Sequence, residues 1–209
     1  MKNIILKEKK ENGMAYTEYD VPVLNREIHS ISDIDFLAKT GWPKGENIRA
    51  RAIMCVASKL GAYDFSDGQK LSLENIKNRD YHHIFPKAIL KDLEVNPDLA
   101  LNCAIITSST NKSLGAKAPM EYIKEKYKVF DEQTIKDRLN SHLIPSSRLT
   151  EIGTLKNDEI TNLKRQYGIF IRERAALVKE AAQQLCKGKQ ITSESILSKD
   201  IDVNIVLRE

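Results

Sequence analysis

The sequence has no long apolar run and no apolar leader. Nothing in its 209 residues approaches the roughly 20 consecutive apolar residues that a membrane-spanning helix needs. The start of the chain, residues 1–7, carries Lys2 and Lys7 around a very short apolar stretch. It is too short and too charged for a secretory signal peptide. We therefore expect a cytoplasmic protein that has no membrane partner.

The sequence is also poor in cysteine. Cys55, Cys103 and Cys186 are odd in number and far apart, and no Cys-x-x-Cys pair occurs. Structural zinc sites commonly take paired cysteines as ligands, so we expect no such site. This cysteine usage fits a reducing cytoplasm.

Neither sign of charge dominates the sequence. It has 33 Lys and Arg against 29 Asp and Glu, and a net charge of +4. That charge favours nucleic acid as a partner but is too small to demonstrate one. The sequence also has no zinc-finger spacing, no aromatic RNA-binding motif and no helix-turn-helix signature. Any base specificity must therefore come from outside this chain.

Two adjacent histidines, His82 and His83, are the most informative residues present, and they stand in the segment YHHIFP (residues 81–86). Asn102 follows His83 by 19 residues inside an apolar run, and Asn111 follows 9 residues later. A strand that ends in the imidazoles, a second strand with one amide and a helix with the other could gather all four side chains around one divalent ion. Such an ion needs a phosphate to act on, so the pattern predicts a metal-dependent nuclease.

The residue types suit the hydrolysis of a phosphodiester, whose charge repels nucleophiles and whose leaving alkoxide is poor. Bound Mg²⁺ or Mn²⁺ neutralises charge at the phosphate and stabilises the leaving oxygen. A neutral imidazole, with an ordinary pKa of about 6.5, takes a proton from water near neutral pH. Mg²⁺ keeps several waters, so one or two side chains suffice to hold it, and the amide oxygen of Asn111 suits so hard a cation. Asn102 would tie the strands together and fix the orientation of the imidazole.

These residues carry a family resemblance. The order His-His-Ile-Phe-Pro, then Asn102, then Asn111 and a Pro-x-x-Tyr-Ile segment at 119–123 resembles the HNH endonucleases of the ββα-metal type. In particular it is similar to the C-terminal nuclease region of GmrSD-type, modification-dependent restriction enzymes. The resemblance covers residues 81–123, about a fifth of the chain.

The resemblance implies a role for each residue. It implies that His83 is the general base and that Asn102 is the asparagine that braces the loop. It implies that His82 and Asn111 bind Mg²⁺ or Mn²⁺, although many members have aspartate where this chain has His82. It also implies DNA as the substrate and a ParB-like, nucleotide-hydrolysing N-terminal domain or subunit as a partner, which nothing in these residues resembles.

Other interpretations of the same residues stay open. Adjacent residues of a strand point to opposite faces, so one histidine could be exposed by chance. Asn102 could be a strand-edge residue and Asn111 an ordinary turn residue. Three acidic residues are alternative metal ligands, and Asp80 is the best of them because it shares a strand face with His82; the other two are Asp64 and Asp67.

Four lysines lie around the proposed site, where phosphate contacts would raise affinity for DNA without reading its sequence. They are Lys87, Lys91, Lys112 and Lys117. Lysines are also common on any solvated surface, so the composition of this region does not decide between the two roles.

Hydrophobic periodicity and cap residues predict a mostly helical protein with a small β element in its middle. We expect helices near 33–37, over 46–60, at 87–93, after Pro119, after Asp131 and over about 158–187. Asn12-Gly13 permits a hairpin or the end of a short helix. Residues 190–199 are expected to form a polar linker, and residues 201–207 alternate like a short strand.

The expected fold class is therefore α+β, mostly helical with an embedded ββα-metal (HNH) nuclease motif. We expect an N-terminal extension at 1–30, a helical nuclease domain at 31–188 with its ββα-metal core at about 78–123, and a C-terminal tail at 189–209. The expected function is DNA hydrolysis, as the nuclease part of a restriction or phage-defence system. The alternatives are a degenerate module that binds DNA or a partner without cutting, and a helical interaction module whose histidines are incidental.

Overall fold

The structure is a computed structural model that describes residues 10–15, 33–45, 47–72, 74–153 and 159–198. The chain divides into two units, Met1–Asp33 and Ile34–Glu209. In the first unit the described residues form a turn, in which Gly13 N–H donates to Lys10 O and Lys10 N–H donates to Met14 O, both at 2.8 Å. Gly13 takes a positive φ of 80°, as a turn at Asn12-Gly13 requires. The strands of the predicted hairpin lie outside the described residues.

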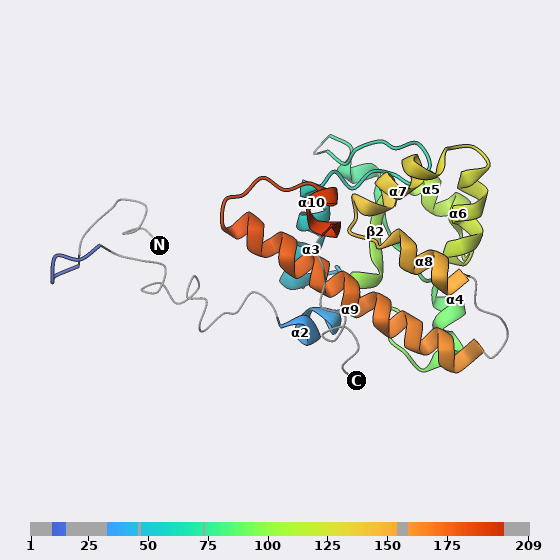
Figure 1. The fold of residues 1–209 in the computed structure, drawn as a ribbon, viewed down its shortest axis with the longest axis horizontal. Coiled ribbons are helices and arrows are strands. Elements are labelled where there is room, and N and C mark those ends of the chain that lie inside the picture. Colours follow the sequence, from blue (N-terminus) through green and yellow to red (C-terminus); the bar gives the residue numbers. More distant parts are fainter. Residues whose placement is uncertain (1–9, 16–32, 46, 73, 154–158, 199–209) are drawn as a thin grey trace. The chain divides into compact units, whose positions relative to one another are not determined.

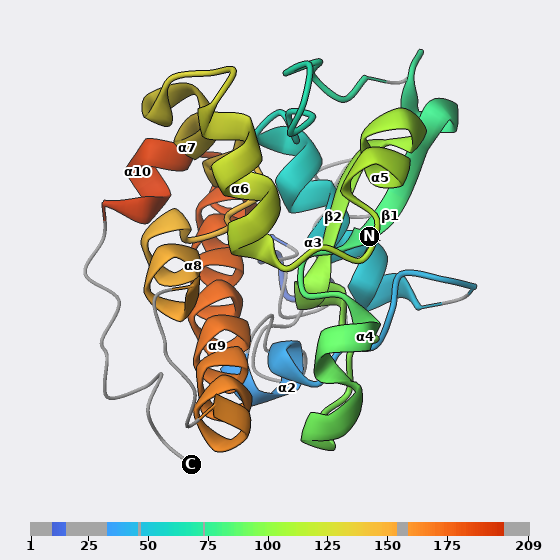
Figure 2. The ribbon, with the colours of Figure 1, turned by 90° about the vertical axis from the view of Figure 1, so that its right-hand side faces the viewer.

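The second unit is mixed α and β and mostly helical, as the sequence predicts (Figure 1). Its described helices are α2 (Ile34–Ala38), α3 (Ile48–Lys59), α4 (Lys87–Leu90), α5 (Ser108–Leu114), α6 (Pro119–Tyr127), α7 (Glu132–Asn140), α8 (Ser146–Gly153), α9 (Glu159–Cys186) and α10 (Ser193–Leu197). Short 3-10 turns occupy Ile76–Asn78, Lys91–Leu93 and Ala100–Asn102. Figure 2 shows α4 and α5 on one side of this unit with the strands, and α7 to α10 on the other.

Strands β1 (Arg79–His83) and β2 (Cys103–Thr107) form a two-stranded antiparallel sheet, in which His83 pairs with Cys103 and Arg79 pairs with Thr107. Two strands alone are marginal in water, so the sheet depends on the helices around it. The apolar run of β2 is accordingly buried from Cys103 to Ile106. Helix α5 follows β2 directly, because the Thr107 side chain accepts a hydrogen bond from Thr110 N and caps the helix.

Helix α9 supplies much of the core behind the sheet. The predicted helix at 158–187 is confirmed, and its apolar stripe includes the buried Tyr167, Phe170 and Leu177. The rings of Tyr167 and Phe170 pack edge-on against Phe85, at centroid distances of 5.5 and 5.0 Å. Phe85 follows the histidines by two residues, so α9 holds the segment that leaves β1.

Two of the predicted helices begin next to a polar side chain that caps them, and the cap at Asp131 was itself predicted. Helix α3 begins at Ile48 because Asn47 Oδ1 accepts a hydrogen bond from Ala50 N at 3.0 Å. Helix α7 begins after Asp131, whose Oδ1 accepts from Thr134 N at 2.8 Å. A side-chain acceptor at this position satisfies a backbone N–H that has no partner inside the helix.

The prediction of a polar linker at residues 190–199 is wrong. Residues 193–197 form α10, and its Ile196 is fully buried. Thr192 Oγ1 accepts from Ser195 N at 3.1 Å, and Thr192 N donates to Ser195 Oγ at 3.0 Å, so the polar residues cap a helix. The helical domain therefore extends into the expected tail, while the strand expected at 201–207 lies outside the described residues.

Among the helices in the described ranges, none has both the length and the apolar character that crossing a bilayer requires.

A buried histidine in this core makes stability depend on pH. His142 Nε2 lies 3.0 Å from the carbonyl oxygen of Tyr63, and burial lowers the pKa of His142 to about 3. In the unfolded chain this pKa is about 6.5. The unfolded state therefore binds the proton first as the pH falls below 6.5, and stability is lost down to about pH 3.

We expect the free energy of unfolding to fall by about 2–3 kcal/mol between pH 7 and pH 4.5 from this residue alone. Urea unfolding at both pH values checks this, with His142→Gln as the comparison. The variant removes the titrating ring but keeps an amide that can donate to Tyr63. Parallel losses of stability in the parent and in His142→Gln would show that the ring does not cause the pH dependence.

Candidate active site

Strand β1 presents its side chains alternately to two separate groups of residues, as extended backbone does. Asp80 and His82 lie on the face that meets α5, where both are linked to Asn111. Tyr81 and His83 lie on the opposite face, where both rings contact Trp42. The two adjacent histidines therefore belong to different clusters.

The first cluster is a hydrogen-bonded row of three side chains. Asn111 Nδ2 donates to Asp80 Oδ2 at 3.1 Å, and Asn111 Oδ1 lies 2.9 Å from His82 Nδ1. Since a carboxylate only accepts, the amide group of Asn111 faces Asp80 and its oxygen faces the imidazole. His82 Nδ1 therefore carries the proton. Its Nε2 is buried and has no hydrogen-bond partner among the described residues.

His82 is nearly sealed from solvent, with 3% of its surface exposed. Burial lowers its pKa; the contact with Asn111 raises it, and the nearby His83 lowers it further. The imidazole is thus neutral near pH 7, which is the form that binds metals. Tyr122 packs edge-on against it at 6.1 Å, and Tyr122 Oη is also buried and unpaired within the described part of the chain.

The donors of this cluster fit a small, hard divalent cation. They offer one imidazole nitrogen, one amide oxygen and one carboxylate, the types that Mg²⁺ and Mn²⁺ accept. The 2.9 Å between His82 Nδ1 and Asn111 Oδ1 matches the roughly 3 Å between neighbouring ligands of an octahedral ion with bonds near 2.1 Å. Ligation through Nδ1 requires its proton to move to the unpaired Nε2. No group of three His, Cys, Asp or Glu that could hold a metal occurs in the described ranges, and here an amide is the third donor.

The second cluster surrounds His83. Its Nε2 lies 2.9 Å from Asp98 Oδ1, while Lys87 Nζ donates to Asp98 Oδ2 at 2.7 Å. The indole of Trp42 stacks on the imidazole, with centroids 3.8 Å apart and planes 11° apart. Burial lowers the pKa of His83, although Asp98 raises it. A neutral imidazole that is still 20% exposed is able to accept a proton from a bound water.

Asn102 connects the two ends of the β1–β2 connection. Its Oδ1 accepts from Phe85 N at 2.9 Å, and its Nδ2 donates to Phe85 O at 3.0 Å and to Pro97 O at 2.9 Å. The side chain is fully buried. One amide therefore fixes both the segment after His83 and the segment before Asp98. None of these three hydrogen bonds involves an imidazole ring.

The backbone around Asn102 is held from α9 by a buried guanidinium. Arg174 donates from NH1 to Leu101 O at 2.7 Å and to Cys103 O at 2.9 Å, and from NH2 to His142 O at 2.8 Å. Burial lowers the pKa of Arg174 to about 10, so the group stays charged at neutral pH. These bonds satisfy carbonyl groups that would otherwise be buried without a partner.

The four predicted residues do not surround one point. His82 and Asn111 contact each other as predicted, but His83 and Asn102 belong to separate hydrogen-bonded groups. The alternation of β1 explains the separation of the histidines. Asn102 lies in the 3-10 turn just before β2 and not within that strand, although its carbonyl still accepts from Ile84 N at 2.9 Å and continues the ladder.

Asp64 and Asp67, the two other acidic residues considered as metal ligands, form hydrogen bonds in and around the loop that lies next to the sheet. Asp64 is fully buried and accepts from Thr110 Oγ1 at 2.6 Å and from Thr107 N at 2.7 Å. Arg79 NH1 lies 3.7 Å from its Oδ2. Asp67 Oδ1 accepts from Gln69 N at 2.7 Å. Asp64 thus holds the start of α5 and has its lone pairs occupied, which leaves Asp80 as the carboxylate near His82.

The four predicted DNA-contacting lysines divide into two pairs. Lys87 and Lys117 contact carboxylates, those of Asp98 and Glu125, each at 2.7 Å. Lys91 and Lys112 are exposed, and neither has an acidic partner among the described residues.

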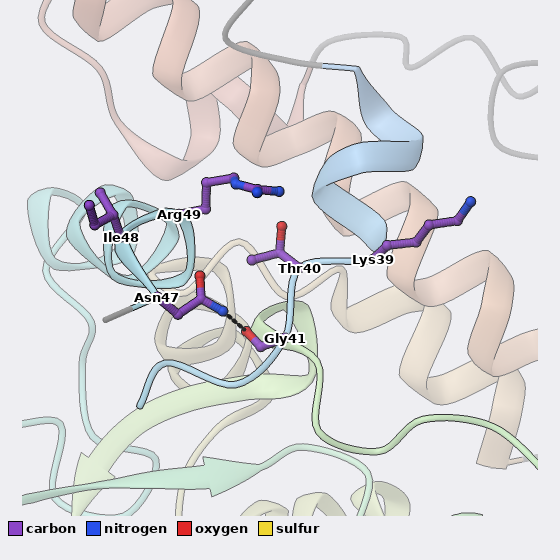
Figure 3. A pocket seen from close by; sticks show the side chains of 6 residues that line it. All are labelled: Lys39, Thr40, Gly41, Asn47, Ile48 and Arg49. Atoms are coloured by element: carbon purple, nitrogen blue, oxygen red, sulfur yellow. Dashed lines mark hydrogen bonds between the residues drawn. The ribbon is translucent and has the colours of Figure 1, made fainter. Parts of the chain in front are cut away.

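A cavity of about 530 Å³ lies between the end of α2 and the start of α3 (Figure 3). It is lined by Lys39, Thr40, Gly41, Asn47, Ile48 and Arg49. Asn47 Nδ2 donates to Gly41 O at 3.2 Å across its floor. No residue predicted from the sequence as part of the site lines this cavity.

Two residues of the second cluster, Asp98 and Trp42, were missed from the sequence. Asp98 follows Pro97 in the irregular β1–β2 connection, and Trp42 lies in the loop between α2 and α3. No motif or spacing connects either residue to His83. Only the fold brings the three together.

No family model matches this chain, and no solved structure matches it.

Proposed function

We propose that this chain is a divalent-metal-dependent endonuclease that hydrolyses DNA phosphodiester bonds. The observation that carries the proposal is the contact of 2.9 Å between His82 Nδ1 and Asn111 Oδ1, with Asp80 beside them, on a strand–strand–helix unit. These three side chains would hold Mg²⁺ or Mn²⁺, which offsets the charge at the phosphate and stabilises the leaving oxygen when bound.

His83 is the proposed general base. It takes a proton from water as the water oxygen bonds to phosphorus and the bond to the leaving oxygen breaks. His83 and the proposed metal ligands lie on opposite faces of β1. The proposal therefore requires the bound phosphate to reach both sides of the strand at its end, where His83 is the last residue. Asn102 acts indirectly, by fixing the backbone at Phe85 and Pro97.

The proposed substrate is DNA with little sequence preference. Lys91 and Lys112 are exposed and free to contact phosphates, which contributes affinity without base readout. The resemblance extends the proposal to the nuclease part of a cytoplasmic restriction or phage-defence system, in which a ParB-like, nucleotide-hydrolysing domain or subunit is the partner.

We expect supercoiled plasmid to pass through the open circle before it becomes linear, because one such centre attacks one phosphodiester at a time. The reaction should require Mg²⁺ or Mn²⁺, stop in EDTA, and slow steeply with salt because non-specific affinity depends on phosphate neutralisation. Agarose gels of a time course at low protein concentration measure all three effects. Cleavage that persists in EDTA would overturn the proposal, and activity confined to RNA would overturn the substrate.

A second function, binding of DNA or a partner without cleavage, is favoured by one observation. Asp98 and Trp42 hold His83 on the strand face opposite His82 and Asn111. Fluorescence anisotropy with labelled duplex DNA separates the two functions. Binding of duplex in Mn²⁺, with plasmid left intact at every metal concentration tried, would favour this second function.

A further inference from the structure

We propose that Asp98 is a positioning residue that fixes the ring of His83 in one orientation and one tautomer, with the proton on Nε2 and the basic lone pair on Nδ1. The part of this proposal that concerns cleavage rests on the proposed function. The part that concerns the tautomer stands on the folded protein alone.

The imidazole of His83 is restrained both at its edge and on its face. Asp98 Oδ1 contacts the edge at Nε2, at 2.9 Å. Trp42 covers the face, at a centroid distance of 3.8 Å. A ring held on the face alone could still flip, and a ring held at one nitrogen alone could still tilt. The two contacts together define one position for each ring nitrogen.

Asp98 lies in a loop that is anchored on both sides. Pro97 O accepts from Asn102 Nδ2 at 2.9 Å, and Asp98 N donates to Asn96 Oδ1 at 2.9 Å. On the other side, Leu99 forms a β-bridge with Gly41. None of these bonds uses the carboxylate of Asp98, so its position does not depend on its contact with His83.

The β-bridge between Gly41 and Leu99 also positions the indole of Trp42, which stacks on His83. Gly41 precedes Trp42 and pairs with Leu99, which follows Asp98. Next to this bridge, Ala100 N donates a hydrogen bond to Thr40 O at 2.8 Å and joins the same two segments a second time. The edge contact and the face contact of His83 thus come from two neighbouring, hydrogen-bonded segments.

The charge of Asp98 decides the tautomer. Lys87 donates to Oδ2 at 2.7 Å and, with His83, holds the pKa of Asp98 below its ordinary value, against a smaller effect of burial. The ionised carboxylate can only accept hydrogen bonds, so neutral His83 must donate to it from Nε2. The lone pair is then on Nδ1. After Nδ1 takes a proton, the same carboxylate stabilises the imidazolium.

The tautomer is tested by NMR of ¹⁵N-labelled full chain near pH 7. The chain has four histidines, so His83→Gln identifies the resonances of this ring. We expect Nε2 of His83 to show the shift of a protonated nitrogen in the parent, and a mixture of tautomers in Asp98→Ala. A ring protonated mainly on Nδ1 in the parent, or one unchanged by Asp98→Ala, would overturn the proposal whether or not the protein cleaves DNA.

The kinetic test uses Asp98→Asn and Asp98→Ala. The amide of Asp98→Asn can accept from Nε2 or donate to it, so it keeps the size of the side chain but not the choice of tautomer. We expect kcat for plasmid nicking to fall about 10–100-fold, as for other groups that orient a reacting side chain, with KM little changed.

Glu132→Gln is the matched control. It removes another exposed carboxylate that pairs with a lysine at 2.7 Å, Lys136 on α7, and we expect it to keep the kcat and KM of the parent. Equal kcat in the parent and both Asp98 variants, or a loss that falls on KM and leaves kcat unchanged, would overturn the positioning role. A parent that shows the Nε2–H tautomer but cuts no DNA would overturn the proposed function and leave the tautomer assignment standing.

Discussion

The His83→Ala variant is expected to cleave plasmid about 10²–10⁴-fold more slowly than the parent, the usual contribution of a general base. Its affinity for Mn²⁺ should stay close to that of the parent, because His83 makes its contacts with Asp98 and Trp42. The proposed metal ligands lie on the other face of β1. Rates at saturating Mn²⁺ and the Mn²⁺ concentration that gives half the maximal rate measure the two effects separately.

Asn111→Ala is the contrasting variant. It removes the amide that joins His82 to Asp80, so it should raise the Mn²⁺ concentration needed for half the maximal rate. Excess Mn²⁺ should then restore part of its activity, whereas no metal concentration should restore His83→Ala. If both variants kept the metal dependence of the parent, or if excess metal restored both, the roles assigned to the two clusters would be wrong.

Helix positions were the most predictable part of this fold, because caps and apolar periodicity are local signals. Asp131 marks a helix start that the structure confirms, and the helix expected over 46–60 is present as Ile48–Lys59. The same local signal was present at Thr192 and was missed, because the segment is short and polar. The buried Ile196 and the partly buried Leu197, which packs against the core, show that this segment belongs to it.

The candidate site was only partly predictable for a different reason. The period of two residues in a strand already implies that His82 and His83 face opposite ways, and the structure agrees. Which face meets Asn111 depends on how α5 packs against the sheet. The contacts of His83 depend on two loops that are more than 50 residues apart in sequence, at Trp42 and Asp98. No spacing rule connects such segments, because tertiary packing alone brings them together.

Asn102→Ala is expected to lower the free energy of unfolding by about 3–5 kcal/mol, because it leaves two buried backbone groups and one partly buried backbone group without partners, at about 1–3 kcal/mol each. These groups are Phe85 N, Phe85 O and Pro97 O. Urea unfolding at pH 7 measures the loss. Asn140→Ala is the control: its side chain makes no hydrogen bond in the described part of the chain, and we expect a change within about 0.5 kcal/mol.

Asn102→Asp separates the hydrogen bonds from the volume of the side chain. The new carboxylate has nearly the shape of the amide, but it places an oxygen beside the carbonyls of Phe85 and Pro97, where Nδ2 now donates at 3.0 and 2.9 Å. Burial and this repulsion raise the pKa of the carboxyl in the folded state above its unfolded value of about 3.9. Its cost therefore grows as the pH rises above 3.9 and shrinks as the pH falls.

At pH 7 we expect Asn102→Asp to be at least as unstable as Asn102→Ala, and at pH 4.5 to regain part of the difference from the parent. Asn102→Ala should show no such recovery, because it has no titrating group. Nicking by both variants should be slow even at temperatures where they are folded, since Asn102 fixes the segments that carry His83 and Asp98. If Asn102→Asp kept the stability of the parent at pH 7, the amide could not be the brace between Phe85 and Pro97.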